Sequence, residues 1–200
     1  MNRQIKSKKR VSDYGEVYTA EREVNAMLDL VREQAASITA TFLEPACGNG
    51  NFVAAILKRK LQTVIVHGGG CEQVMLNILR AVSSIYGVDI QSDNVYETRN
   101  RLRTLAEEIF DSQVGIIGHM KYLWLKKLDL ILGLNIMCGN TLTAKMDDGS
   151  DMRMSEWTIS DQGAIIRDEM QYKDILDGID DPIRHNIYRY RLQMNMSAVA

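Results

Sequence analysis

Residues 42–52, with the sequence FLEPACGNGNF, read as a short buried strand, a tight glycine-rich turn and the start of a helix. Glu44 stands at the strand end, and Gly48 and Gly50 permit a close approach of the backbone. Phe52 begins the apolar face of the helix. Turns of this kind hold small polar ligands against backbone N–H groups at a helix N-terminus. We therefore expect a ligand site in this turn.

Around the turn, apolar periodicity predicts alternating helices and strands. The expected helices cover residues 20–34, 51–61, 72–83, 92–110 and 119–132, and the expected strands cover residues 41–46, 85–90 and 135–140. Thr19 is the expected N-cap of the first helix, and residues 62–71 predict a flexible break. The alternation is typical of a parallel sheet with crossover helices. Ligands of such α/β sheets bind at the carboxyl ends of the strands, where Glu44, Asp89 and Asn140 stand.

The pattern changes after residue 143. Residues 155–159 and 164–167 flank a turn and predict a β-hairpin, and short helices are expected at residues 171–178 and 183–194. Residues 147–181 hold eleven acidic residues against three basic ones. We expect residues 146–200 to form an acidic hairpin and helix extension that packs on the same domain.

Charge and composition narrow the class of protein. Residues 1–10 carry five basic residues and no acidic one, so we expect residues 1–14 to be a flexible basic arm, compatible with a solvated tail or with DNA. No apolar run reaches the ~20 residues of a membrane span, and the N-terminus lacks the apolar segment of a secretory signal. Three widely spaced cysteines indicate a reducing, cytoplasmic setting. No Cys/His cluster has zinc spacing, so no metal site is expected.

Four segments resemble, in order, the cofactor motifs of adenine-N6 DNA methyltransferases of the restriction–modification type. Residues 44–52 resemble the first motif, residues 85–90 the second, and residues 136–142 the third, with Asn140 where Asp is usual. Upstream, the sequence GEVYT at residues 15–19 resembles the G-x-x-[FY]-T-P segment of the family, with Ala20 in place of the proline.

The resemblance implies a Rossmann-like, S-adenosylmethionine-dependent methyltransferase fold. Its parallel sheet would be incomplete here, with helices on both faces and a C-terminal hairpin and helix appendage. Residues 15–145 would form the cofactor-binding domain, with S-adenosyl-L-methionine as cofactor. The residues that the resemblance assigns to the cofactor are Tyr18, Thr19, Glu44, Pro45, Ala46, Gly48, Gly50, Asn51, Phe52, Asp89, Ile90, Asn140, Thr141 and Leu142.

The implied roles have a physical logic. The carboxylate of the cofactor would meet Thr19 and a helix N-terminus, and its ammonium would meet Glu44 and the carbonyls around Ala46. Asp89 would accept hydrogen bonds from both ribose hydroxyls, and Ile90 would pack on the adenine. Gly-rich backbone would approach the methionine part closely.

Each residue also has a plain structural alternative. Asn140 would offer its amide oxygen to the adenine amino group, or it occupies a turn. Thr19 and Asp89 suit helix N-caps, and Glu44 suits a helix cap or a salt bridge. Phe52, Tyr86 and Leu142 suit the core.

The family motif that binds the target base is missing. Members carry [DNS]-P-P-[YFW], whereas this chain has only Pro45 and Pro182, and residues 180–183 are the nearest imitation. The catalytic residues are therefore unknown. An incomplete sheet would also expose apolar edges, so we expect DNA as one partner and a second copy or a partner subunit as another, with no membrane.

Three hypotheses remain. The first is an adenine-N6 DNA methyltransferase whose base pocket is unrecognised or supplied by a partner. The second is a non-catalytic cofactor-binding subunit, or a regulator of a methyltransferase or restriction system. The third is a degenerate relic that binds nothing.

Overall fold

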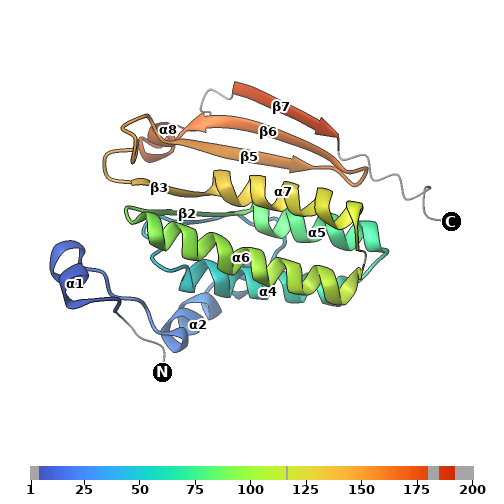
Figure 1. Cartoon of the computed structure of the whole chain (residues 1–200), viewed down its shortest axis with the longest axis horizontal. Helices are drawn as coiled ribbons and strands as arrows, with labels where there is room; N and C mark the ends of the chain where they lie inside the picture. Colours follow the sequence, from blue (N-terminus) through green and yellow to red (C-terminus); the bar gives the residue numbers. More distant parts are fainter. Residues whose placement is uncertain (1–4, 116, 180–184, 192–200) are drawn as a thin grey trace.

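The computed structural model describes residues 5–115, 117–179 and 185–191. These residues form a mixed α/β structure with two sheets, one of four strands and one of three (Figure 1). The strands of the first sheet lie in the order β1-β2-β3-β4, and those of the second in the order β5-β6-β7. No helix among the described residues is both long enough and apolar enough to cross a membrane.

The first sheet carries the three strands that the sequence predicts. Strands β1 (Phe42–Glu44), β2 (Ile85–Asp89) and β3 (Ile136–Asn140) pair in parallel, with Phe42 opposite Ile85 and Gly87 opposite Ile136. Strand β1 is shorter than the expected strand at residues 41–46. It ends before Pro45, which has no N–H to donate to the neighbouring strand. A two-residue strand, β4 (Lys145–Met146), adds antiparallel to β3, so the sheet is mixed and not wholly parallel.

The long helices extend beyond their expected ends. They are α4 (Asn51–His67), α5 (Cys71–Ser83), α6 (Ser92–Gln113) and α7 (His119–Asn135). The expected break at residues 62–71 therefore shrinks to three glycines, and α4 ends where Gly68 takes a φ of +59°. One residue separates α5 from β2, and none separates α7 from β3. These two helices therefore lead directly into the strands and lie beyond the end of the sheet at which the strands begin (Figure 1).

The expected helix over residues 20–34 is two helices, α2 (Glu21–Asp29) and α3 (Arg32–Ala36). The chain leaves the helical path at Val31, whose φ and ψ are −124° and 41°. The break lets α3 change direction and bury Ala35 before the chain enters β1. A continuous apolar periodicity cannot reveal such a break, because both halves keep their buried face.

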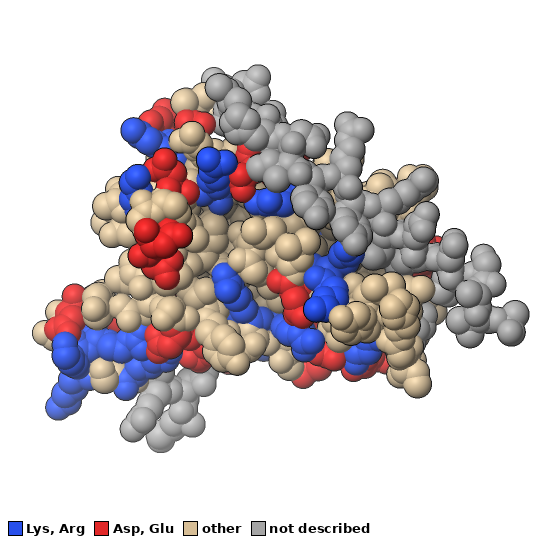
Figure 2. Space-filling view, turned by 45° about the horizontal axis from the view of Figure 1, so that its top comes forward, with Lys and Arg blue, Asp and Glu red and all other residues tan. Residues whose placement is uncertain are grey.

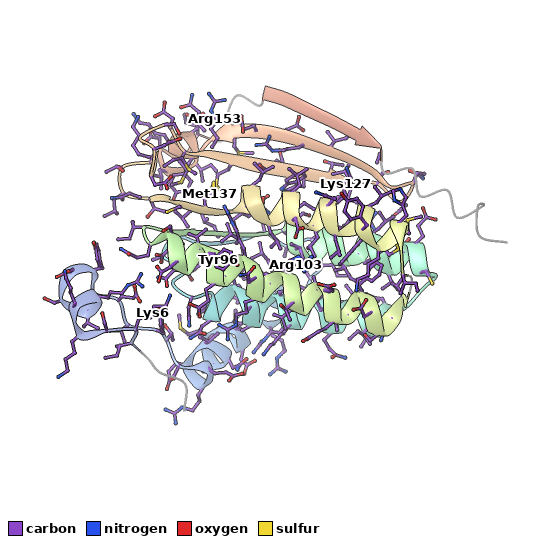
Figure 3. The ribbon with its side chains drawn as sticks, in the orientation of Figure 1. Lys6, Tyr96, Arg103, Lys127, Met137 and Arg153 are labelled. Carbon is purple, nitrogen blue, oxygen red and sulfur yellow. The ribbon has the colours of Figure 1, made fainter. Side chains whose placement is uncertain are left out.

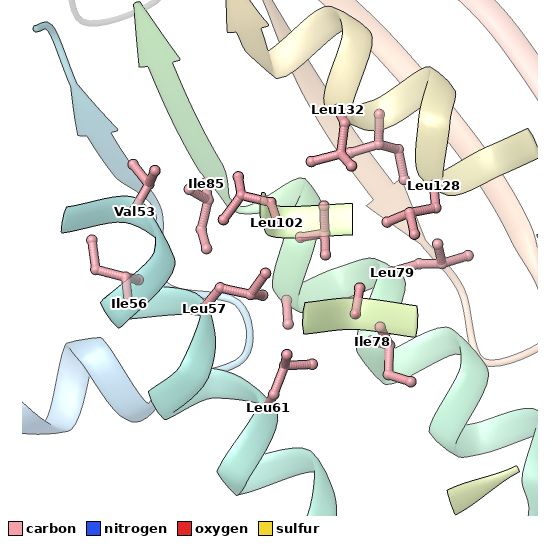
Figure 4. Packing of buried hydrophobic residues seen from close by; sticks show 14 of the residues in the cluster. Val53, Ile56, Leu57, Leu61, Ile78, Leu79, Ile85, Leu102, Leu128 and Leu132 are labelled. Atoms are coloured by element: carbon pink, nitrogen blue, oxygen red, sulfur yellow. The ribbon is translucent and has the colours of Figure 1, made fainter. Parts of the chain in front are cut away.

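Alternate residues of the first sheet face two different cores. Ile85 and Ile136 pack with Val53 of α4 and Leu102 of α6, in the helical core of Figure 4. On the other face, Tyr86, Val88 and Met137 pack with residues that follow β3 in the chain, namely Ala144, Met152, Met154 and Tyr172. α4 and α6 therefore cover one face, and the C-terminal extension covers the other, where Tyr172 of the short helix α8 (Tyr172–Leu176) is the helical contribution (Figure 1).

The C-terminal extension begins with the predicted hairpin, β5 (Arg153–Ile159) and β6 (Ala164–Gln171). Helix α8 (Tyr172–Leu176) corresponds to the first expected short helix, whereas residues 185–191 of the second form strand β7 (His185–Arg191). The free edge of β6 pairs antiparallel with β7, so tertiary context overrides local preference. Residues 180–184 and 192–194 of that prediction lie outside the described residues.

Polar contacts tie the hairpin to the helices. The Trp157 indole donates to Asn135 Oδ1 at 2.8 Å, and the Asn135 amide donates to the carbonyls of Ser83 and Ile85 at 3.0 and 3.1 Å. Arg80 donates to the Ile159 carbonyl from Nε and Nη2, at 3.0 and 2.9 Å. These contacts fix the hairpin against α5, α7 and the start of β2.

The N-terminal segment differs from the flexible arm that its composition suggests. Residues 8–14 form helix α1 (Lys8–Tyr14), which Ser7 caps by accepting the Arg10 N–H at 3.2 Å and which Gly15 ends in a left-handed conformation. Residues 1–4 lie outside the described residues.

Candidate functional site

A cavity of about 360 Å³ lies at the carboxyl ends of β1, β2 and β3. Four stretches line it: residues 14–19, 44–52, 89–91 and 140–142, with Gly50 as a gap in the second. Thirteen of the fourteen residues that the resemblance assigns to a cofactor lie in its wall. Segments almost 130 residues apart in the chain therefore meet at one site, as parallel strands with crossover connections allow.

Gly50 is the exception, and its role differs from the expected one. It takes a φ of +82° at the start of α4, and a Cβ there would lie 2.7 Å from Thr98 Oγ1. The absence of a side chain at Gly50 therefore lets α4 pack closely against α6. It does not serve the close approach of a ligand to the turn. Gly48, by contrast, lines the cavity at a φ of +53°, where a Cβ would touch the Tyr18 ring at 3.2 Å.

Asp89 joins the turn to the end of β2. Its Oδ2 accepts the Gly48 N–H at 2.9 Å, and its Oδ1 accepts the Gln91 N–H at 2.8 Å and the Asn94 amide at 3.2 Å. The residue is 9% exposed and lines the cavity. The N-cap position of α6 belongs to Gln91, so Asp89 is not the N-cap. A carboxylate oxygen accepts more than one hydrogen bond, which leaves Oδ2 able to accept another donor from the cavity.

Glu44 is a half-buried acid at the end of β1. Desolvation raises the pKa of its carboxyl group, opposed by a hydrogen bond from the Ala46 N–H at 3.4 Å. No ion pair of Glu44 occurs among the described residues, so the salt-bridge alternative finds no partner there. A cation that enters the cavity would stabilise the ionised Glu44 carboxylate, because it offsets the cost of desolvation.

Residues 15–19 form one wall. Tyr18 is 7% exposed, and its hydroxyl lies 2.7 Å from Glu16 Oε1 and 3.1 Å from Asn94 Oδ1. Thr19 is exposed and is not a helix cap, since α2 begins after Ala20 without a side-chain cap. The Thr19 carbonyl instead accepts the Asn51 amide at 3.0 Å, which fixes this wall against the first residue of α4.

The opposite wall follows β3. Asn140 Oδ1 accepts the Leu142 N–H at 2.9 Å, so Asn140 both shapes a turn and lines the cavity. Thr141 donates to the Pro45 carbonyl at 3.3 Å, which ties this turn to the first one. Leu142 is 92% exposed, and the expectation that it belongs to the core is wrong. With Ile90, 49% exposed, it presents apolar surface at the cavity.

Seven residues of the wall were not assigned from the sequence: Tyr14, Gly15, Glu16, Val17, Cys47, Asn49 and Gln91. All seven lie within or directly beside the four motifs, so widening each motif by one residue would have found them. Burial raises the pKa of the Cys47 thiol to about 12, so this thiol stays protonated at neutral pH. No group of His, Cys, Asp and Glu suited to a metal ion occurs in the part of the chain that the structure describes.

The charge of the wall is one-sided. Three of the described residues that line it are acidic, Glu16, Glu44 and Asp89, and none is Lys, Arg or His; Glu16 pairs with Arg10, so Glu44 and Asp89 set the charge that a ligand meets. The cavity therefore suits a ligand with cationic and hydroxyl groups and disfavours one with phosphates. Comparison of the chain with protein-family models, curated proteins and solved structures found no match.

Proposed function

We propose that the cavity binds S-adenosylmethionine and that the chain is a DNA adenine-N6 methyltransferase-like protein with a Rossmann-like fold. The observation that carries the proposal is the acidic, cation-free wall at the carboxyl ends of three parallel strands. S-adenosylmethionine has an ammonium and a sulfonium against one carboxylate and no phosphate. Nicotinamide dinucleotides and ATP carry phosphates, which this wall would repel.

The residues of the wall match the parts of this ligand. Glu44 would receive the ammonium, and Asp89 would accept the ribose hydroxyls. Ile90 and Leu142 would cover the adenine, which explains why two large apolar side chains stay exposed at the cavity. The ligand carboxylate would lie at the N-terminus of α4, whose first N–H groups have no partner within the helix.

When bound, S-adenosylmethionine supplies an activated methyl group. Transfer to an adenine N6 would form an N–CH3 bond, break the S–CH3 bond and release one proton together with S-adenosylhomocysteine. The adenine of DNA as acceptor rests on the resemblance of the four motifs. No residue is assigned to the base, and the nearest imitation of the base-binding motif, at residues 180–183, lies outside the described residues.

A non-catalytic or half-enzyme role is the second candidate, and the edges of the first sheet favour it. Strand β4 occupies the β3 edge, whereas β1 ends the sheet on the other side, with Leu43 38% exposed. Strands supplied by a partner would therefore add beside β1, next to Glu44. The C-terminal extension covers the second face of the sheet, so the β1 edge is where a partner could cover apolar surface of the sheet.

The charge pattern bears on the expected DNA partner. Acidic and basic side chains are interspersed on the face shown in Figure 2, and they do not form one basic band there. The phosphates of the DNA backbone bind to clustered Lys and Arg side chains. The mixed charges of this face therefore suit contact with a partner subunit better than direct contact with DNA.

Calorimetric titration with S-adenosylmethionine tests the cofactor. We expect saturable binding by the natural chain, loss of affinity by at least about 30-fold in Asp89→Ala, and no binding of NAD or ATP. Asp129→Ala is the matched control, because Asp129 is an exposed acid on α7 that pairs with Arg103. Failure of the natural chain to bind S-adenosylmethionine would refute the proposal and favour the relic. Transfer of labelled methyl groups to adenine-unmethylated DNA then separates the enzyme from the cofactor-binding subunit.

A further inference from the structure

Residues 5–19, here called the N-terminal clamp, dock on the first turn of α6. Arg10 holds Asp93 with two bonds, Nη1 to Oδ2 at 2.6 Å and Nη2 to Oδ1 at 2.8 Å. Lys6 Nζ lies 3.0 Å from Asp93 Oδ2 and 2.9 Å from Glu97 Oε2. Figure 3 places Lys6 beside the end of α6 that faces α1. The Arg10 side chain is 18% exposed, and bidentate pairs of this kind are the stronger ones.

A chain of hydrogen bonds leads from these ion pairs to the cavity. Lys6 Nζ donates to Asn94 Oδ1 at 2.7 Å, and the Asn94 amide donates to Asp89 Oδ1 at 3.2 Å. Asn94 is 1% exposed, so its two ends have fixed partners in the interior. The clamp therefore reaches the Asp89 carboxylate through one buried side chain.

The clamp also forms a wall of the cavity. Arg10 Nε lies 2.8 Å from Glu16 Oε2, and Tyr18 shares Glu16 with Arg10. None of the seven residues of α1 is buried, so polar contacts and not a core hold this helix in place. Hydrogen bonds from Arg10 hold the pKa of the Asp93 carboxyl group well below its ordinary range, so the pair stays charged at neutral pH.

We infer that Arg10 and Lys6 are positioning residues of the cavity, which fix its clamp wall directly and Asp89 through Asn94. Docking of the clamp and binding of S-adenosylmethionine then stabilise each other, as linkage requires. The inference rests on the proposed function. The plain alternative is a set of surface ion pairs that only anchor the N-terminus, which would leave ligand affinity unchanged.

The test compares Arg10→Ala with Lys9→Ala, a control on the same helix whose ion pair with Asp13 stays within α1. S-adenosylhomocysteine serves as the probe together with S-adenosylmethionine, because it has no net charge and its own binding responds little to salt. We expect Arg10→Ala to weaken binding of both about 10-fold, Lys9→Ala to leave it unchanged, and Arg10→Lys to recover part of the loss. The affinity of the natural chain for S-adenosylhomocysteine should fall between about 0.05 and about 0.5 M salt, and that fall should be smaller in Arg10→Ala, which keeps only the ion pairs of Lys6.

Hydrogen exchange distinguishes the two explanations, because ion pairs that only anchor the N-terminus would not make amide protection in α1 depend on the bound ligand. The probe should protect the amides of residues 8–13, which do not line the cavity, in the natural chain and not in Arg10→Ala. Equal affinity and equal protection in Arg10→Ala and Lys9→Ala would overturn the inference and leave the proposed function standing. Absence of binding by the natural chain would overturn both. If Arg10→Ala does not fold, Lys6→Ala takes its place with the same expected loss.

Discussion

Substitution of Gly50 by alanine tests how the turn and the two central helices fit together. Gly50 precedes α4 at a φ of +82°, where L-residues with a Cβ are strained. The new Cβ would lie 2.7 Å from Oγ1 and 2.9 Å from Cγ2 of Thr98, which is fully buried in α6. Real Cβ atoms do not approach other atoms so closely, so α4 or α6 has to shift.

The expected loss of unfolding free energy combines two effects. A left-handed backbone costs a residue with a Cβ about 1–2 kcal/mol, and overpacking of a well-filled site costs about 1–3 kcal/mol. Gly50→Ala should therefore destabilise the protein by about 2–5 kcal/mol. Gly178→Ala is the matched control, because Gly178 also has a positive φ, +67°, but nothing lies within 4 Å of its added Cβ. The control should show the backbone effect alone.

The assay is urea unfolding followed by circular dichroism, with a double-mutant cycle on Thr98→Ala. Thr98→Ala alone removes the 3.1 Å hydrogen bond from the Thr98 hydroxyl to the Gly48 carbonyl and should cost about 1 kcal/mol. It also removes the two atoms that clash, so the double variant should be more stable than the sum of the single changes predicts. A cost of Gly50→Ala no greater than that of Gly178→Ala, or strict additivity, would refute the packing explanation.

Two further predictions concern buried polar groups. Burial lowers the pKa of Lys60 to about 8 from 10.5, so between these pH values the unfolded chain binds more protons, and the unfolding free energy should rise with pH by up to about 3 kcal/mol. Thermal unfolding across this pH window should show that rise, unchanged in the exposed control Lys58→Met and absent in Lys60→Met. Trp157→Phe leaves the oxygen of the fully buried Asn135 without its 2.8 Å donor and should cost about 1–3 kcal/mol in urea unfolding; a cost under about 0.5 kcal/mol would contradict this.

Local pattern was enough for the central elements. Apolar periodicity placed β2 and β3 and the helices between them, and the glycine-rich turn with its flanking acids placed Glu44 and Asp89 at one edge of the sheet. The reason is general: parallel strands with crossover helices bring their carboxyl ends together, so residues at those ends become neighbours without further information.

Local apolar periodicity did not predict the contacts between segments that are distant in the chain. Arg10 and Lys6 look like a solvated basic tail in sequence, and only the fold brings them to Asp93, more than 80 residues away. Likewise β7 forms because the edge of β6 is free, and Leu142 is exposed because the chain turns outward at the cavity. Periodicity records which face of an element is buried, whereas the partner of a charge, an edge or a turn depends on where the rest of the chain lies.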